Sequence, residues 1–314
     1  MHALVEPVVA WFDAHARELP WRHADRTAWG VLVSEVMLQQ TPVARVEPVW
    51  RAWMQRWPTA ADLAAARPDD VLRAWGRLGY PRRALRLQEC ARVVVARHDG
   101  DLPDGEAALV DLPGIGTYTA AAVTAFARGR RAVVVDTNVR RVLARALEGR
   151  ALPAPHLSSA ELRRAGDVVP EDDAASARWN AAVMELGALV CTARSPRCDA
   201  CPVADRCRWR LAGMPPDELA GRRRRQAWHG TDRQARGRVM AALRDAAHPL
   251  TDGDLAPLWP EDDQRARVLA SLLADGLAVA VDDDRGPAYR LPGGPVAAEE
   301  RATLSTADAV ELPA

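Results

Sequence analysis

Lysine is absent from this sequence of 314 residues, so arginine supplies all 42 of its basic side chains apart from histidine. This absence excludes catalysis through a Schiff base on a lysine side chain. The sequence also has no apolar run near the roughly 20 residues that span a bilayer, and its start lacks the basic region and cleavage site of a secretory signal. We therefore expect a cytoplasmic protein outside the membrane. Its 42 basic and 42 acidic residues balance, so any basic surface for a nucleic acid must be local.

Helical periodicity dominates the first two thirds of the chain, where alternating strand patterns are missing. Apolar residues recur every three or four positions, most clearly in residues 31–41, 68–79, 81–98 and 175–191. Pro, Gly and Asp residues separate these segments, as expected between helices. We predict an all-α domain over residues 1–213.

A second, smaller domain is expected over residues 230–292, after an arginine-rich linker at 214–229. Three helical segments, at 233–246, 251–259 and 262–276, precede two strand-like segments around the sequence DDRG. Thr251 is expected to cap the second helix and Gly276 to end the third. Three helices closed by a hairpin resemble a winged-helix α+β domain.

Two further features of this region have alternative interpretations. Arg265 and Arg267 lie on the third helix, which either enters a DNA groove or serves packing or protein docking. The tail at 293–314 is rich in Ala and Glu and has no aromatic residue, so we expect it to be disordered.

Four cysteines follow the helical region in the spacing C-x6-C-x2-C-x5-C. They are Cys191, Cys198, Cys201 and Cys207. Disulfides are not expected in a reducing cytoplasm, and zinc usually takes two C-x2-C pairs where this array has one. A [4Fe–4S] cluster with four cysteine ligands fits better, with zinc as the alternative. Cys90 lies in an amphipathic helix and is expected to be plain core.

This cysteine spacing, after an all-α region that contains LPGIG, resembles the endonuclease III superfamily of helix-hairpin-helix DNA glycosylases. The resemblance covers about residues 4–210 and implies two helical subdomains and a cluster loop at 191–207. In that family the cluster implies a structural and DNA-docking role. Arg194 and Arg197, between the ligands, would then face phosphates; by composition they are equally solvated loop charges.

The hairpin LPGIG contains Gly114 and Gly116 before a helix. Backbone N–H groups in such a turn form an anion site, and glycine lets a DNA backbone come close. Superfamily members that also nick the strand carry a lysine two residues after the second glycine, where this chain has Tyr118. Without any lysine, the resemblance implies a monofunctional glycosylase without lysine-dependent lyase activity.

A glycosylase needs an acid to protonate the leaving base and a carboxylate to stabilise the sugar cation. Glu35 lies in the largely apolar segment LVSEVMLQQT, where burial would raise its pKa and keep it protonated. Asp136 follows the apolar run RAVVV. Both carboxylates have structural alternatives: Asp136 as an ordinary N-cap, and Glu35 as a partnered glutamate at a helix start.

The motifs LPWR, SEVMLQQT, LGY, GIGTYT, VDTNVRRVL and MELGALVC resemble, in their order, those of the MutY-type adenine glycosylase family. The resemblance implies that Glu35 protonates adenine N7, that Asp136 stabilises or traps the sugar cation, and that Asn138 and Tyr118 position these groups. It also implies an adenine pocket and a set of residues that wedge into the duplex and bind it. The pocket residues would be Arg17, Trp21, Leu38 and Glu185. The wedge residues would be Gln40, Thr41, Leu78 and Tyr80, with Gln39 as a further DNA-binding residue. For Leu78 and Tyr80, packing at a helix end is the alternative.

The family usually carries a C-terminal Nudix-like β domain, and this chain has the helical module in its place. The resemblance implies a base excision repair enzyme that flips adenine out of A:8-oxoguanine or A:G mispairs in double-stranded DNA. We expect a monomer associated with the nucleoid. The alternatives are another glycosylase of the superfamily, for mismatched thymine or oxidised pyrimidines, and an iron–sulfur DNA-binding regulator without enzyme activity.

Overall fold

The computed structural model describes residues 2–222 and 228–294. The chain forms two compact units, one of residues 1–64 and 89–226 and the other of residues 65–88 and 227–314. The two units are described separately below. The boundaries expected from the sequence at 213 and 230 remain a prediction. The tail was expected to be disordered, but its residues 295–314 lie outside the described part of the chain. Residues 223–227 of the linker lie outside it as well.

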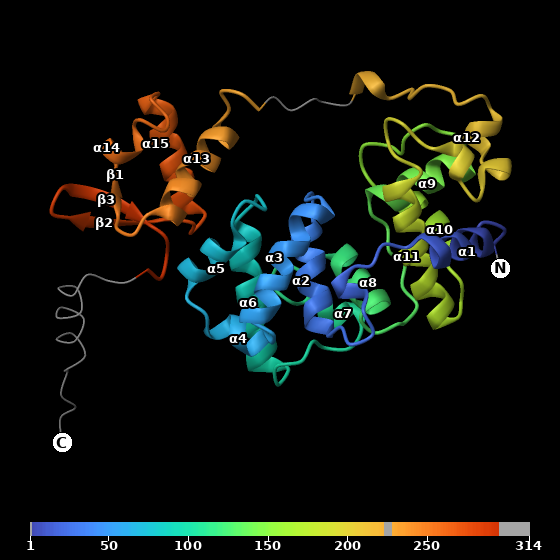
Figure 1. Cartoon of the computed structure of the whole chain (residues 1–314), viewed down its shortest axis with the longest axis horizontal. Coiled ribbons are helices and arrows are strands. Elements are labelled where there is room, and N and C mark those ends of the chain that lie inside the picture. Colours follow the sequence, from blue (N-terminus) through green and yellow to red (C-terminus); the bar gives the residue numbers. More distant parts are fainter. Residues whose placement is uncertain (1, 223–227, 295–314) are drawn as a thin grey trace. The chain divides into compact units, whose positions relative to one another are not determined.

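The first unit is helical, as the periodicity predicts (Figure 1). Its helices are α1 (Val5–His15), α2 (Ala28–Leu38), α3 (Val43–Arg56), α4 (Ala60–Ala65), α7 (Glu106–Val110), α8 (Thr117–Phe126), α9 (Thr137–Glu148), α10 (Ser159–Val168), α11 (Asp173–Leu189) and α12 (Arg208–Leu211), with α6 (Arg82–Arg97) continuing into it from the second unit. The described residues of this unit contain no strand. The expectation of an all-α first region is confirmed.

Helix α11 organises the core of the first unit. Trp179 and Leu186 on this helix are buried with Val8 of α1 and Val142 of α9 in one apolar cluster. Helices α9 and α11 approach each other closely at Gly187, where an added Cβ would lie 2.7 Å from the Cβ of Asn138. Glycine at this point therefore lets the first turn of α9 rest directly against α11.

Local capping fixes where the helices that matter for the site begin. The Thr27 hydroxyl accepts a hydrogen bond from Gly30 N–H and starts α2, and the Asp136 carboxylate accepts one from Val139 N–H and starts α9. Such caps satisfy backbone donors that have no partner within the helix. The sequence segment 31–41 was expected to be helical to its end, but α2 ends at Leu38 and Gln40 takes a positive φ of 56°.

The second unit holds the C-terminal module with α5 (Pro68–Trp75) and the start of α6. The module contains the three expected helices and the expected hairpin. These elements are α13 (Asp232–Asp245), α14 (Asp252–Leu255), α15 (Asp262–Ala274), β2 (Val279–Asp283) and β3 (Gly286–Arg290), with β1 (Leu250–Thr251) added. The sheet is antiparallel in the order β1-β3-β2, so the module has a winged-helix-like arrangement (Figure 1).

The boundaries within the module agree with the sequence in part. Thr251 caps α14 in a reciprocal capping box with Asp254, and Gly276 follows α15 with a φ of 65°. The second helix is much shorter than the nine residues expected, because only Asp252–Leu255 are helical.

Of the two alternatives for the third helix, the packing alternative holds for Arg265. Its side chain is buried, donates to Asp252 and Asp262, and also donates to the carbonyl of Trp259. Arg265 therefore joins α14 to the start of α15 from inside the module. Arg267, by contrast, is exposed and lies 3.5 Å from Asp232.

Candidate active site

A cavity of about 1310 Å³ lies within the first unit. It is lined by residues of α2, α8, α9 and α11 and of the segment between α1 and α2. The sequence-predicted residues that line it are Arg17, Trp21, Glu35, Leu38, Gln39, Gln40, Thr41, Tyr118, Asp136, Asn138 and Glu185. Residues 168 positions apart in the chain therefore share one wall, as the contact of Arg17 with Glu185 shows.

Glu35 lies on α2 and is buried between apolar neighbours. Burial, with the charge of Asp136, outweighs the lowering by a hydrogen bond from Tyr118 and by the charge of Arg22, and raises the pKa of Glu35 to about 7. A carboxyl with this pKa is substantially protonated near neutral pH, so it is suited to act as a general acid.

Tyr118 occupies the second position of α8, directly after the hairpin. Its hydroxyl donates to Glu35 Oε2 at 3.0 Å. Burial and the nearby carboxylates raise the pKa of Tyr118 well above its usual value, so the phenol remains a hydrogen-bond donor.

Asp136 is the N-cap of α9, and both of its carboxylate oxygens accept hydrogen bonds. Val139 N–H donates to Oδ1 and the Asn138 amide to Oδ2, each at 2.7 Å. Burial raises the pKa of Asp136, and these hydrogen bonds oppose that rise. The capping alternative for Asp136 and its place in the cavity hold at the same time, because the cap orients the carboxylate.

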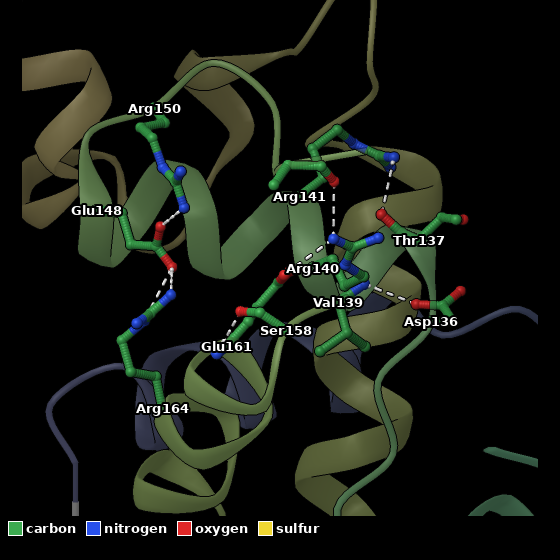
Figure 2. Close-up of polar contacts among 11 residues, drawn as sticks. Asp136, Thr137, Val139, Arg140, Arg141, Glu148, Arg150, Ser158, Glu161 and Arg164 are labelled. Carbon is green, nitrogen blue, oxygen red and sulfur yellow. Dashed lines mark hydrogen bonds and ion pairs between the residues drawn. The ribbon is translucent and has the colours of Figure 1, made fainter. Parts of the chain in front are cut away.

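Arg141 connects this carboxylate to the cysteine loop. One of its N–H groups donates to Asn138 Oδ1 at 2.8 Å and another to the carbonyl of Cys191 at 2.6 Å. Figure 2 shows Arg141 on the first turns of α9, with Thr137 and Asp136 beside it. Asn138 is thereby held on two sides, by Asp136 and by Arg141.

Arg140, the neighbour of Arg141, turns the other way and lines the cavity. It donates to both oxygens of Glu161 on α10, at 2.6 and 2.9 Å, and to the carbonyl of Ala154 (Figure 2). Both side chains of this ion pair are almost fully buried, so the pair fixes the segment between α9 and α10.

Glu185 on α11 closes the opposite side of the cavity. Burial would raise the pKa of Glu185, but hydrogen bonds from Arg17 and the charge of Arg22 outweigh it and lower the pKa to about 2. Trp21 packs beside this ion-pair group, edge-on to Trp50. Arg22 was missed in the sequence, where the only signal was its position in LPWR next to two expected pocket residues.

The candidate wedge residues divide between the two units. Gln39, Gln40 and Thr41 line the cavity of the first unit. Leu78 and Tyr80 belong to the second unit, where Leu78 is buried and Tyr80 is 44% exposed with a positive φ of 48°. The burial of Leu78 favours its packing alternative, whereas Tyr80 is available to a ligand.

The hairpin between α7 and α8 has the geometry expected for an anion site. Gly114 takes a positive φ of 79°, and Gly116 is the N-cap of α8. Nothing lies within 4 Å of a Cβ built at Gly116, so the space in front of the helix start is open. The backbone of another molecule can approach the N–H groups here.

The four cysteines of the loop are half-buried and form no disulfide. Burial, with the charges of Cys191, Cys207 and Cys198, raises the pKa of Cys201 to about 11. Arg145 donates to the Cys191 sulfur at 3.3 Å and stacks on Trp209. In the part of the chain that the structure describes, no group of three or more His, Cys, Asp or Glu side chains is placed to hold a metal ion, so the fit to an iron–sulfur cluster rests on the number and spacing of the four thiols.

The other loop predictions have clear positions in the structure. Arg194 and Arg197 are exposed, and Arg197 also donates to the carbonyl of Leu189.

Cys90 is fully buried, which confirms that it is core. Among the described residues, no helix has the length and apolar character that a membrane crossing requires.

Comparison with known families covers both the helical region and the loop. Residues 33–166 match the HhH-GPD superfamily of base excision DNA repair proteins, where HhH is the helix-hairpin-helix. Residues 191–207 match the iron-sulfur binding domain of endonuclease III, which confirms the cluster and its four cysteine ligands.

Individual relatives agree with this assignment. The adenine DNA glycosylase of Mycolicibacterium smegmatis is 52% identical over 284 residues, which is 90% of this chain and 95% of that protein. The adenine DNA glycosylase of Homo sapiens is 44% identical over 211 residues, 65% of this chain and 38% of that one. The match to the mycobacterial relative is therefore long enough to include most of the C-terminal module.

A solved structure gives the same fold. A thermostable thymine-DNA glycosylase superposes with a TM-score of 0.60 and 28% sequence identity, over 66% of this chain and 95% of that one. Together with the sequence matches, this similarity confirms the helix-hairpin-helix fold and the iron–sulfur loop. The chain belongs to the adenine DNA glycosylases, the base excision repair enzymes of the HhH-GPD superfamily to which its closely similar mycobacterial relatives also belong.

Proposed function

We propose that this protein removes adenine mispaired with 8-oxoguanine or guanine from double-stranded DNA, acting as a monomer in the cytoplasm where the nucleoid lies. The observation that carries the proposal is the buried, hydrogen-bonded Glu35 in the same cavity as Asp136. The adenine must leave the base stack to reach this cavity, at a cost of a few kcal/mol. Gln40, Thr41 and Tyr80 are the residues that we assign to the space it leaves.

The acid step uses Glu35. The Tyr118 hydroxyl donates to Oε2, so we assign the transferable proton to Oε1. This proton passes to N7 of the flipped adenine, which makes the base a neutral leaving group as the C1′–N9 bond breaks. Arg17, Glu185 and Trp21 shape the pocket around the base, and Arg22 joins them through its hydrogen bond to Glu185.

The sugar step uses Asp136. Bond breaking leaves positive charge on the sugar, as in glycoside hydrolysis, and an anionic carboxylate stabilises it. The hydrogen bonds from Val139 and Asn138 favour the anionic form of Asp136 and fix its direction. Water then forms the bond to C1′, either directly or by displacing Asp136 after that carboxylate has bonded to C1′. The proton lost by the water returns to the Glu35 carboxylate, which the acid step left deprotonated.

Strand cleavage is not part of the proposed reaction. The position of the imine-forming amine in strand-nicking relatives is Tyr118, and the chain has no lysine. Cys191, Cys198, Cys201 and Cys207 would hold the [4Fe–4S] cluster, which would stabilise the loop and supply no reacting group to this scheme. Arg194 and Arg197 on that loop, with the hairpin at Gly114 and Gly116, are the proposed phosphate contacts.

A second candidate substrate is mismatched thymine. The thymine-DNA glycosylase of Aeropyrum pernix is 32% identical over 210 residues, 66% of this chain and 94% of that protein. A pyrimidine leaves without protonation at a purine nitrogen, so this candidate gives no role to a buried acid at Glu35.

The test is base release from three duplexes, with A opposite 8-oxoguanine, A opposite guanine, and T opposite guanine. We expect adenine release from the first two and no thymine release. Absence of adenine release from both A mispairs would refute the proposal, and release of thymine alone would establish the second candidate. Borohydride trapping on an abasic duplex is expected to be negative, and sedimentation of the free protein is expected to give a monomer.

A further inference from the structure

The C-terminal module shares its unit with the segment that carries Tyr80. Arg73 of α5 donates to the carbonyl of Ala246 at 3.0 Å, and Arg82 lies 3.0 Å from Asp275 at the end of α15. Asp275 also accepts from Arg236 of α13 at 2.7 Å. The module is thus tied to residues 65–88 at several points and can act on the same ligand as Tyr80.

Arginine and aromatic side chains alternate across this junction, and we call them the arginine–aromatic stack. Its members are Trp75, Arg83, Tyr80, Arg233 and Trp228. The Arg83 guanidinium lies 5.2 Å from the ring centre of buried Trp75 and 5.6 Å from that of Tyr80. The Arg233 guanidinium, from the first turn of α13, lies 5.1 Å from Tyr80 and 5.5 Å from Trp228. The stack therefore begins in the core at Trp75 and ends at the surface at Trp228.

The outer part of the stack is exposed. Tyr80 is 44% exposed and Trp228 is 48% exposed, and Arg233 between them is exposed as well. Exposed aromatic rings beside guanidinium groups are the combination on which proteins stack nucleobases. The contacts with Arg83 and Arg233 also restrict the rotamers of Tyr80 in the free protein, so less side-chain entropy is lost when Tyr80 binds a ligand.

Charge supports a nucleic acid as the ligand. Residues 65–88 contain six arginines and two aspartates, and residues 228–245 contain four arginines and two aspartates. The rest of the module, residues 246–292, contains four arginines and nine acidic residues, so the basic excess is confined to the two segments that carry the stack. A local excess of arginine attracts phosphate.

We propose that the arginine–aromatic stack is a DNA-binding platform through which the C-terminal module binds the duplex, with Arg233 holding Tyr80 and Trp228 extending the stacking surface. This inference rests on the proposed function, from which it takes the contact of Tyr80 with DNA. It gives the module a direct part in substrate binding through the start of α13, while Arg265 of its third helix stays buried.

The experiment measures the Kd of the full-length, cluster-loaded protein for a duplex with A opposite 8-oxoguanine by fluorescence anisotropy. All variants carry Glu35→Gln so that the adenine stays in place. Trp228→Ala and Arg233→Ala are compared with Arg285→Ala, which removes an exposed arginine at the tip of the hairpin in the same module, where it pairs with Asp283 and Asp254.

We expect Trp228→Ala and Arg233→Ala each to raise Kd about five-fold or more, and Arg285→Ala to change it by less than about two-fold. Arg233→Lys keeps the charge without the planar guanidinium and is expected to bind as weakly as Arg233→Ala. Trp228 is at the surface, so Trp228→Ala is expected to fold and tests the proposal even where an Arg233 variant unfolds.

The proposal is overturned by Trp228→Ala binding as tightly as Arg285→Ala, or by full recovery in Arg233→Lys, which would leave only a charge effect. A wild-type protein that binds the duplex but releases no adenine would refute the proposed function and leave this comparison readable. Adenine release by the wild-type protein, together with equal Kd values in all of the Glu35→Gln variants, would refute the platform alone.

Discussion

At the scale of single residues, the decisive property is the free-energy cost of ionising Glu35, which is buried on the largely apolar helix α2. Its pKa rises from 4.5 to about 7, mainly through burial. Between these two pH values the folded protein keeps a proton that the unfolded chain has lost. The free energy of unfolding therefore falls as pH rises through this window, by an amount on the order of 3 kcal/mol.

The first prediction concerns Glu35→Gln, which keeps the shape and removes the acid. We expect adenine release to slow by about 10² to 10⁴-fold, because no general acid remains. We also expect the variant to be more stable than the wild type at pH 8 and similar at pH 4.5, because glutamine has no charge to bury. Single-turnover base release and urea unfolding at both pH values measure this. Glu89→Gln, on an exposed glutamate of α6, is the control and should leave both quantities unchanged.

The second prediction concerns Tyr118→Phe. The Tyr118 hydrogen bond lowers the pKa of Glu35, so its removal should raise that pKa. Wild-type release is expected to decline as pH rises through about 7, since the protonated acid is the active form. In Tyr118→Phe this decline should move to higher pH. A pH profile of the single-turnover rate that does not move would show that the hydroxyl does not control Glu35.

At the scale of elements, the site depends on two helices that meet at one glycine. An alanine at Gly187 would place its Cβ 2.7 Å from the Cβ of Asn138 and 2.9 Å from its carbonyl oxygen. The first turn of α9 carries Asp136 at its N-cap, so a shift of this turn moves the carboxylate that faces the sugar.

The third prediction is that Gly187→Ala destabilises the protein by about 1–3 kcal/mol through overpacking and slows base release. The matched control is Gly166→Ala in α10, where the nearest atom to a new Cβ lies at an ordinary 3.7 Å. A helix normally gains from this exchange, so the control should be neutral or more stable. Thermal unfolding and base release are compared for both, and equal behaviour would contradict the close packing at Gly187.

At the scale of the whole molecule, four short segments have to come together: the helix of Glu35, the hairpin before Tyr118, the start of α9, and the cysteine loop. Arg141 and Arg145 make the last of these connections, because they donate to Asn138 and to the carbonyls and a sulfur of the loop. Hydrogen bonds from these two arginines therefore join the cysteine loop to the helix that begins at Asp136.

The fourth prediction separates the cluster cysteines from the core cysteine. Cys201→Ala should lose iron, measured as iron and sulfide per chain and as visible absorbance, because the cluster needs four thiolates. Cys90→Ala removes a buried thiol of α6 and should keep the full iron content. Equal iron content in the two variants would show that Cys201 is not a ligand.

Several features were determined by the sequence alone, because they depend on spacing along one segment. The helices, the cysteine array, the hairpin, and the absence of lysine are of this kind, and so is the C-terminal module with its capping at Thr251. A period, a cap or a ligand spacing acts over a few residues, where sequence neighbours are also spatial neighbours.

The tertiary structure decided what depends on distant partners. Arg265 has the same sequence context as an exposed groove-binding arginine, and only the packing of α14 against α15 buries it. Arg22 joins the pocket through Glu185, 163 residues later, and Arg233 reaches Tyr80 from the other end of the chain. Hydrogen-bond and charge partners are set by long-range contacts, so the hydrogen bond from Tyr118 to Glu35 and the arginine–aromatic stack became visible only in the folded chain.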